Sequence, residues 1–165
     1  MSIGITLEEL LRWNDQSASY WKNHLDANPN VLDLPCGIGG AANVQAFVRH
    51  IWGAELRWSE RLASTPETPR ESIPAGPLDA LYDLHRRAMS MFRGLLAAAE
   101  SSWSELYVIQ LDVIPPNLRN VPRRKIAANA LIHSQRHWAQ LATLVRQAGF
   151  PSEFKGDLGF SSALR

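Results

Sequence analysis

Two histidines, His133 and His137, stand four residues apart in a stretch with the periodicity of an amphipathic helix. Side chains at positions i and i+4 share one helix face, with Cβ atoms about 5–6 Å apart, so both imidazoles can point at one metal ion. A single histidine in an apolar stripe is most simply a neutral core residue that is hydrogen-bonded to a neighbour. Two on one stripe favour metal binding, because burying two unpartnered imidazoles is costly.

The three residues between these histidines are Ser134, Gln135 and Arg136. The glutamate of the zinc-protease pattern His-Glu-x-x-His is therefore absent. This difference excludes the usual protease mechanism but leaves metal binding open. At least one further ligand is then needed.

The other histidines of the chain differ in their surroundings. His50 lies one turn from Phe47 and Ala54, on the flank of an apolar stripe, where a side chain faces the seam between two helices. We therefore predict that His50 is the third ligand. His24, at the polar end of the first helix, is interpreted as a surface residue. His85, near the edge of the third helical stripe, is expected to have a packing or supporting role.

Four segments have helical periodicity and recognisable ends. The first begins at a capping box, Thr6-x-x-Glu9, in which two side chains satisfy free backbone NH groups. The last ends at Gly149, with Pro151 two residues further on. The predicted helices run from Thr6 to about Ala27, from Val44 to Leu62, from Leu78 towards Ala99, and from Pro122 or Arg123 to Gly149.

The segment from Ser101 to Pro122 is predicted to be a long, partly extended crossover. Residues 107–113 favour extended structure, and three prolines forbid a continuous helix. Four helices of five or six turns bury their stripes together only as a bundle. We predict one all-α domain over residues 1–165, a four-helix bundle with a long crossover between helices 3 and 4. The metal site is expected at an open end of this bundle, and the tail after Gly149 is expected to be a flap or strap.

The composition is that of an ordinary globular domain, with 45% hydrophobic and 20% charged residues. Seventeen Lys and Arg against sixteen Asp and Glu give a formal charge of +1, which argues against a nucleic acid partner. No apolar run approaches the roughly 20 residues of a membrane span, and no signal pattern opens the chain. We expect a cytoplasmic protein. The single cysteine, Cys36, cannot form an internal disulfide.

The segments Val48–Trp58 and His133–Gly149 together resemble the DinB/YfiT-like metal-binding four-helix bundles, and the resemblance covers nearly the whole chain. In that family, one histidine of the second helix and two of the last form a metal site. The resemblance therefore implies a three-histidine site made by His50, His133 and His137.

This chain departs from the family pattern directly after its final histidine. The family commonly has Arg-Gly there, whereas this sequence has Trp138-Ala139. The departure leaves ligation possible, but it puts any contact of the usual arginine in doubt.

Three neutral imidazoles leave at least one coordination position for water or substrate. Nitrogen ligands suit several metals, and the resemblance implies zinc or nickel. Characterised relatives imply a thiol S-transferase, in which a metal-bound low-molecular-weight thiolate attacks an electrophile. The alternatives are a metal-dependent hydrolase that uses metal-bound water, and a non-enzymatic, stress-associated metal-binding module. The relatives also imply a homodimer.

Several further residues near the predicted ligands have open roles. Glu55 and Gln140 are candidates for orienting ligands or moving protons. Trp138 and Trp52 are interpreted as core residues rather than as substrate-stacking groups. Cys36 lies in a glycine-rich connection without a neighbouring histidine and is not expected to be a nucleophile.

Overall fold

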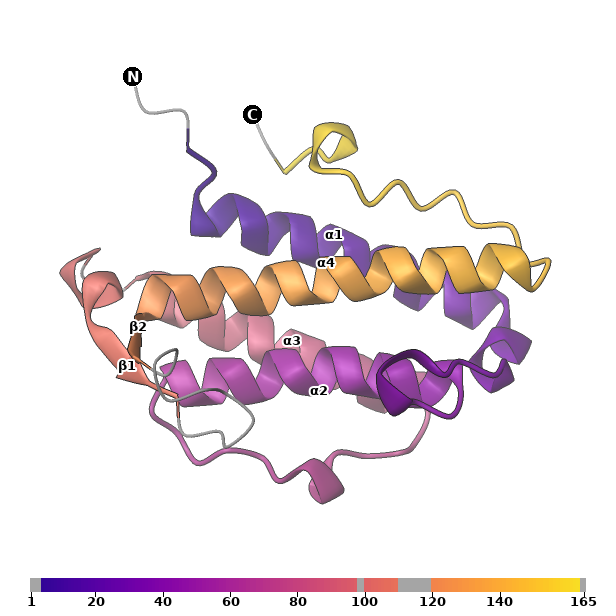
Figure 1. Cartoon of the computed structure of the whole chain (residues 1–165), viewed down its shortest axis with the longest axis horizontal. Helices are drawn as coiled ribbons and strands as arrows, with labels where there is room; N and C mark the ends of the chain where they lie inside the picture. Colours follow the sequence, from indigo (N-terminus) through magenta and orange to yellow (C-terminus); the bar gives the residue numbers. More distant parts are fainter. Residues whose placement is uncertain (1–3, 98–99, 110–119, 164–165) are drawn as a thin grey trace.

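The computed structural model describes residues 4–97, 100–109 and 120–163 of the chain. Within these ranges four long helices form the framework, which confirms the predicted all-α four-helix bundle (Figure 1). Their bounds are α1 Leu7–Ala27, α2 Val44–Leu62, α3 Leu78–Leu96 and α4 Arg123–Gln147. None of the helices in the described part is long and apolar enough to cross a membrane.

The helix ends follow the sequence signals. The Thr6 hydroxyl accepts a hydrogen bond from the Glu9 backbone NH at 3.1 Å, and the Glu9 carboxylate accepts one from the Thr6 NH at 2.7 Å. At the end of α4, Gly149 has a φ of +84°, a conformation in which a side chain would be strained. The Phe150 NH then donates to the Val145 carbonyl at 3.0 Å, which closes a Schellman motif.

Each helix has two neighbours in the bundle. Helix α2 packs against α3 and α4, and α1 packs against the same two helices from the other side. Helices α1 and α2 therefore lie diagonally opposite each other. Three fully buried tryptophans, Trp21, Trp52 and Trp138, fill much of the centre, and Trp138 stacks on Trp21 with ring centroids 5.8 Å apart. The interpretation of Trp52 and Trp138 as core residues is confirmed.

Spacings of three and four residues in the sequence predict one apolar stripe on α4, made of Ile126, Ala130, His133, His137, Leu141, Leu144 and Ala148. The buried face of α4 is rotated from this predicted stripe. Its centre is Leu131, Ser134, Trp138, Leu141 and Val145. The indole of Trp138 takes the central place, so the histidine stripe forms the edge of the buried face. The stripe residue Ala148 is exposed, and His133 is only partly buried.

The crossover between α3 and α4 contains a small antiparallel sheet. Strand β1 (Leu106–Val108) pairs with β2 (Asn120–Pro122), with Leu106 opposite Pro122. The predicted extended structure is thus found at the start of residues 107–113. Residues 110–113 lie outside the described residues.

The tail after α4 is an ordered strap that runs back along α1 (Figure 1). Phe154 packs on Tyr20 and Trp21, with ring centroids 5.3 Å from each. The Gln16 amide donates to the Ser162 hydroxyl at 2.7 Å. These contacts place the strap on α1 and not over the seam between α2 and α4.

Candidate metal centre

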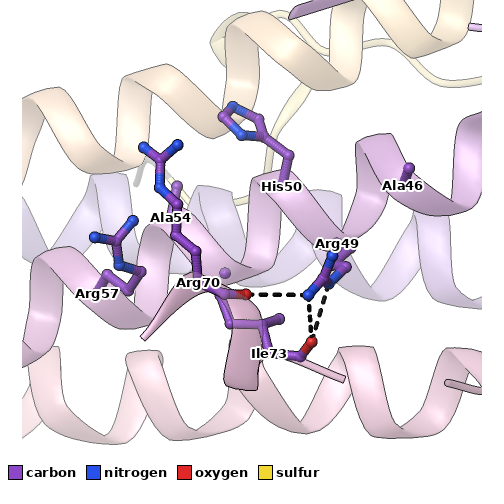
Figure 2. A pocket seen from close by; sticks show the side chains of 8 residues that line it. Ala46, Arg49, His50, Ala54, Arg57, Arg70 and Ile73 are labelled. Carbon is purple, nitrogen blue, oxygen red and sulfur yellow. Dashed lines mark hydrogen bonds between the residues drawn. The ribbon is translucent and has the colours of Figure 1, made fainter. Parts of the chain in front are cut away.

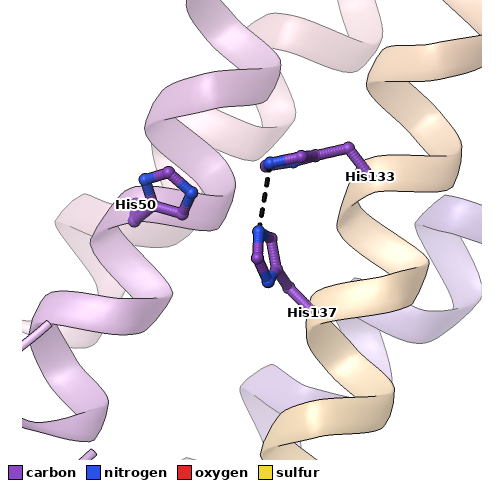
Figure 3. Close-up of side chains that lie close together, drawn as sticks. All are labelled: His50, His133 and His137. Carbon is purple, nitrogen blue, oxygen red and sulfur yellow. Dashed lines mark hydrogen bonds between the residues drawn. The ribbon is translucent and has the colours of Figure 1, made fainter. Parts of the chain in front are cut away.

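Three histidines converge on the seam between α2 and α4 (Figure 3). His50 extends from α2 and both His133 and His137 extend from α4, and one ring nitrogen of each lies within 4.8 Å of the others. The predicted trio is therefore brought together. Its position differs from the prediction, because the trio lies along the side of the bundle, near the middle of α4, and not at an open end.

His133 and His137 share a close contact. Their Nε2 atoms lie 3.0 Å apart (Figure 3). Two lone pairs repel each other at this distance unless a proton or a cation lies between them. Two nitrogen ligands of a tetrahedral zinc ion, each about 2.0–2.1 Å from the metal, are roughly 3.3 Å apart. The pair is therefore already close to the spacing that a shared ion requires.

Gln140 fixes the ring of His137. Its side-chain oxygen lies 2.6 Å from His137 Nδ1. Because an amide oxygen only accepts, Nδ1 carries the proton, and Nε2 presents its lone pair towards His133 and His50. Metal-bound histidines commonly use a partner of this kind to set their tautomer and ring orientation. Gln140 thus holds one histidine in a state that can bind a cation.

The three imidazoles are neutral at neutral pH. Burial, together with the nearby His137 and His50, lowers the pKa of His133 to about 4. Burial also lowers the pKa of His137 and of His50. Since a histidine must be deprotonated to bind a metal, these shifts keep the lone pairs available. The donor set therefore fits a divalent ion of the zinc, nickel or copper type.

The exposure of the trio differs from one member to the next. His137 is buried, His133 is partly buried and His50 is exposed. The Nδ1 atom of His133 is buried without a hydrogen-bond partner in the described structure. Because His50 is the exposed member of the trio, a small molecule can approach the ring nitrogens from the His50 side.

Glu55 does not reach the three histidines. It is buried in the centre of the bundle, where it accepts a hydrogen bond from Asn14 at 2.7 Å and contacts His85 Nδ1 at 2.7 Å. Gln135 donates to the Asn14 side-chain oxygen at 3.0 Å and accepts from the Ser17 hydroxyl at 2.9 Å. We call these five residues the polar layer, and they come from all four helices.

His85 is the cationic member of the polar layer. Burial by itself lowers its pKa, but the Glu55 charge and the hydrogen bonds to Asp15 and Glu55 outweigh burial and raise the pKa to about 9. His85 is therefore an imidazolium at neutral pH, held between two carboxylates. The sequence suggested a packing or supporting role for His85. It could not indicate the two carboxylate partners, Asp15 and Glu55, because they are far from His85 along the chain.

His24 is not the plain surface residue that its polar neighbours suggested. Its ring stacks on Tyr20 with centroids 5.9 Å apart and meets Trp21 edge-on, and its Nε2 is buried without a partner in the described structure. It belongs to α1, diagonally across the bundle from α2. His24 is therefore separate from the candidate metal centre.

A cavity of about 170 Å³ opens next to His50 (Figure 2). Three arginines line it together with His50: Arg49 and Arg57 from α2, and Arg70 from the loop between α2 and α3. The sequence pattern does not predict that these arginines belong to the site. The spacing of Arg49, His50 and Arg57 on one helix was visible, but nothing in the sequence places Arg70 beside them.

The sequence matches no family model, and no curated protein matches it.

Proposed function

We propose that His50, His133 and His137 bind one divalent metal ion, zinc or nickel, in a DinB/YfiT-like bundle. With this ion the protein would act as a thiol S-transferase on a small electrophile. The observation that carries the proposal is the convergence of three neutral imidazoles within 4.8 Å on a seam that is open on the His50 side. Three histidine ligands leave a coordination position for a small molecule.

The chain's own residues have distinct parts in this proposal. Gln140 orients His137, and the core face of α4 holds His133 beside it. His50 completes the donor set from α2 and has room to adjust, because it is exposed. A divalent ion bound there would lower the pKa of a coordinated thiol or water, so that an anionic nucleophile is present at neutral pH.

The lining of the cavity favours a thiol over water as the nucleophile. Hydrolysis by water commonly uses a carboxylate or histidine to accept a proton during attack. No carboxylate lines the cavity described beside His50, and Glu55 is engaged in the polar layer. A thiol that is deprotonated on binding needs no such base. Hydrolysis is therefore the second candidate.

Metal content tests the ligands directly. Protein purified without a nickel column should contain about one divalent ion per chain, measured by elemental analysis. His133→Ala and His137→Ala should lose most of the ion, and His50→Ala should bind it more weakly. His24→Ala is the matched control and should keep it. If His50→Ala keeps its metal and His24→Ala loses it, the assigned ligand set is wrong.

Turnover tests the reaction class. The metal-loaded protein should accelerate displacement of halide from an activated aryl halide by a small thiol, which gives the aryl thioether and free halide, and chelation or His137→Ala should abolish the acceleration. Products that form from esters or amides without any thiol would instead identify a hydrolase. If the protein binds metal but accelerates neither reaction, the non-enzymatic module is the better description.

A further inference from the structure

All the charged side chains that line the cavity beside His50 are positively charged. Arg49, Arg57 and Arg70 surround it, and none of its lining residues is acidic (Figure 2). We call these three side chains, together with His50, the arginine pocket. Small residues of α2, such as Ala46 and Ala54, form the floor and leave its volume free.

Little nearby negative charge compensates these arginines. Among the described residues, Arg49 donates only to neutral backbone carbonyls, those of Ile73 and Arg70, each at 3.0 Å. Arg57 shares the single carboxylate of Glu67 with Arg61. Arg70 forms no ion pair in the described part of the chain, and its side chain extends across α2, past Ala54, towards the level of His50 (Figure 2). The pocket therefore carries a net positive charge.

The position of Arg70 is built into the packing of its loop. Ile73 lies so close to α2 that a Cβ added to Gly53 would be 2.7 Å from the Ile73 Cδ1 atom. Arg49 also binds the loop through two carbonyls, since its Nη2 donates to Arg70 O at 3.0 Å and its Nε donates to Ile73 O. The glycine and the arginine together hold the loop against α2, and this attachment brings Arg70 to the cavity.

We propose that the arginine pocket binds an oxyanion, a carboxylate or a phosphate, carried by the small molecule that reacts at the three histidines. A cavity that holds one water measures only about 10–15 Å³ on this scale, so 170 Å³ has room for such a group. The guanidinium fork matches the geometry of both anions. Because His50 belongs to both sites, the bound anion would lie next to the metal ligands. The binding site stands on its own, whereas the identity of its ligand as a substrate rests on the proposed function.

Anion binding can be measured without the metal. Metal-free protein is titrated calorimetrically with inorganic phosphate and, separately, with succinate, at constant ionic strength. We expect saturable binding of at least one probe, and Arg70→Gln should weaken it about tenfold or more, because a charge-assisted contact is lost. The better-bound probe identifies the anion class. Arg12→Gln removes the same charge from an exposed position on α1 and should leave both titrations unchanged.

A second variant tests the placement of Arg70 by its loop. Gly53→Ala retains every arginine but pushes Ile73 away from α2, so it should weaken anion binding in the same direction. Equal affinity in wild type and Arg70→Gln, or no binding of either probe by wild type, would overturn the proposal. Thermal unfolding of each variant checks that it folds.

Metal analysis of the same variants separates the two proposals. Arg70→Gln should keep the metal content of wild type, because Arg70 is not a ligand. If anion binding depends on Arg70 but the protein takes up no metal, the proposal of the arginine pocket is supported and that of the metal centre is contradicted. If the protein takes up metal but anion binding is the same with and without Arg70, the metal centre is supported and the arginine pocket is contradicted.

Discussion

The buried imidazolium of His85 makes the stability of this bundle depend on pH in a defined direction. Its pKa rises from 6.5 in the unfolded chain to about 9 in the folded one. Between these values the folded protein holds one proton more than the unfolded protein. The stabilisation is fully present below pH 6.5 and is lost as the pH rises through 9. The shift corresponds to about 3 kcal/mol, and the free energy of unfolding should fall by up to about 1.4 kcal/mol per pH unit.

The histidines of the seam act in the opposite direction and in a different range. Burial lowers the pKa of His50, His133 and His137 in the folded protein. Below pH 6.5 the unfolded chain therefore binds more protons, and stability falls as the solution becomes more acidic. Metal-free protein should consequently be most stable near pH 6.5. The fall in stability above pH 6.5 reports on His85, whereas the fall below pH 6.5 reports on the seam histidines together with His24, whose pKa burial also lowers.

Urea unfolding followed by circular dichroism between pH 5 and pH 9.5 measures the whole profile. His85→Gln should remove the fall above pH 6.5 and leave the acidic limb in place. His24→Gln, a substitution on a different helix and outside the polar layer, should leave the fall unchanged. If the difference in unfolding free energy between wild type and His85→Gln stays constant from pH 6.5 to pH 9, His85 is not an imidazolium and the reasoning fails.

Two further predictions concern single contacts. Gln140→Ala releases the ring of His137 and should weaken metal binding about 10- to 100-fold in a competition titration with a chelator, while an unchanged affinity would show that the contact does not orient the ligand. Thr6→Ala removes the cap of α1 and should cost about 1 kcal/mol in thermal unfolding, without changing the metal content. A larger loss of stability would mean that Thr6 has contacts beyond the capping box.

The helix boundaries could be predicted because their signals are local. The Thr6 and Glu9 capping box and the glycine turn at Gly149 each act within a few residues of one another. The pairing of His133 with His137 follows from the helix repeat for the same reason. The prediction that His50 lies opposite His133 and His137 required that α2 and α4 be neighbours. The structure shows that these two helices are in contact.

Other features depend on contacts that the sequence does not contain. The rotation of α4 about its axis was predicted imperfectly, because the periodicity alone does not show that Trp138 takes the centre of the core. Glu55 and His85 meet across the core from two helices, with Asn14 added from a third. Arg70 reaches the cavity only because a loop packs against Gly53. These are tertiary contacts between segments that are far apart in the chain.

The polar layer lies at the same level as the seam histidines, since Gln135 stands between His133 and His137, and Glu55 follows His50 by little more than one turn. A helix that rolled by one residue would turn by about 100° and break these buried hydrogen bonds. The layer therefore locks the rotation of α2 and α4. The conformational entropy that is lost when three separate histidines come together is therefore lost mainly during folding. Metal binding does not have to order these side chains again, so the ligands are preorganised for a cation.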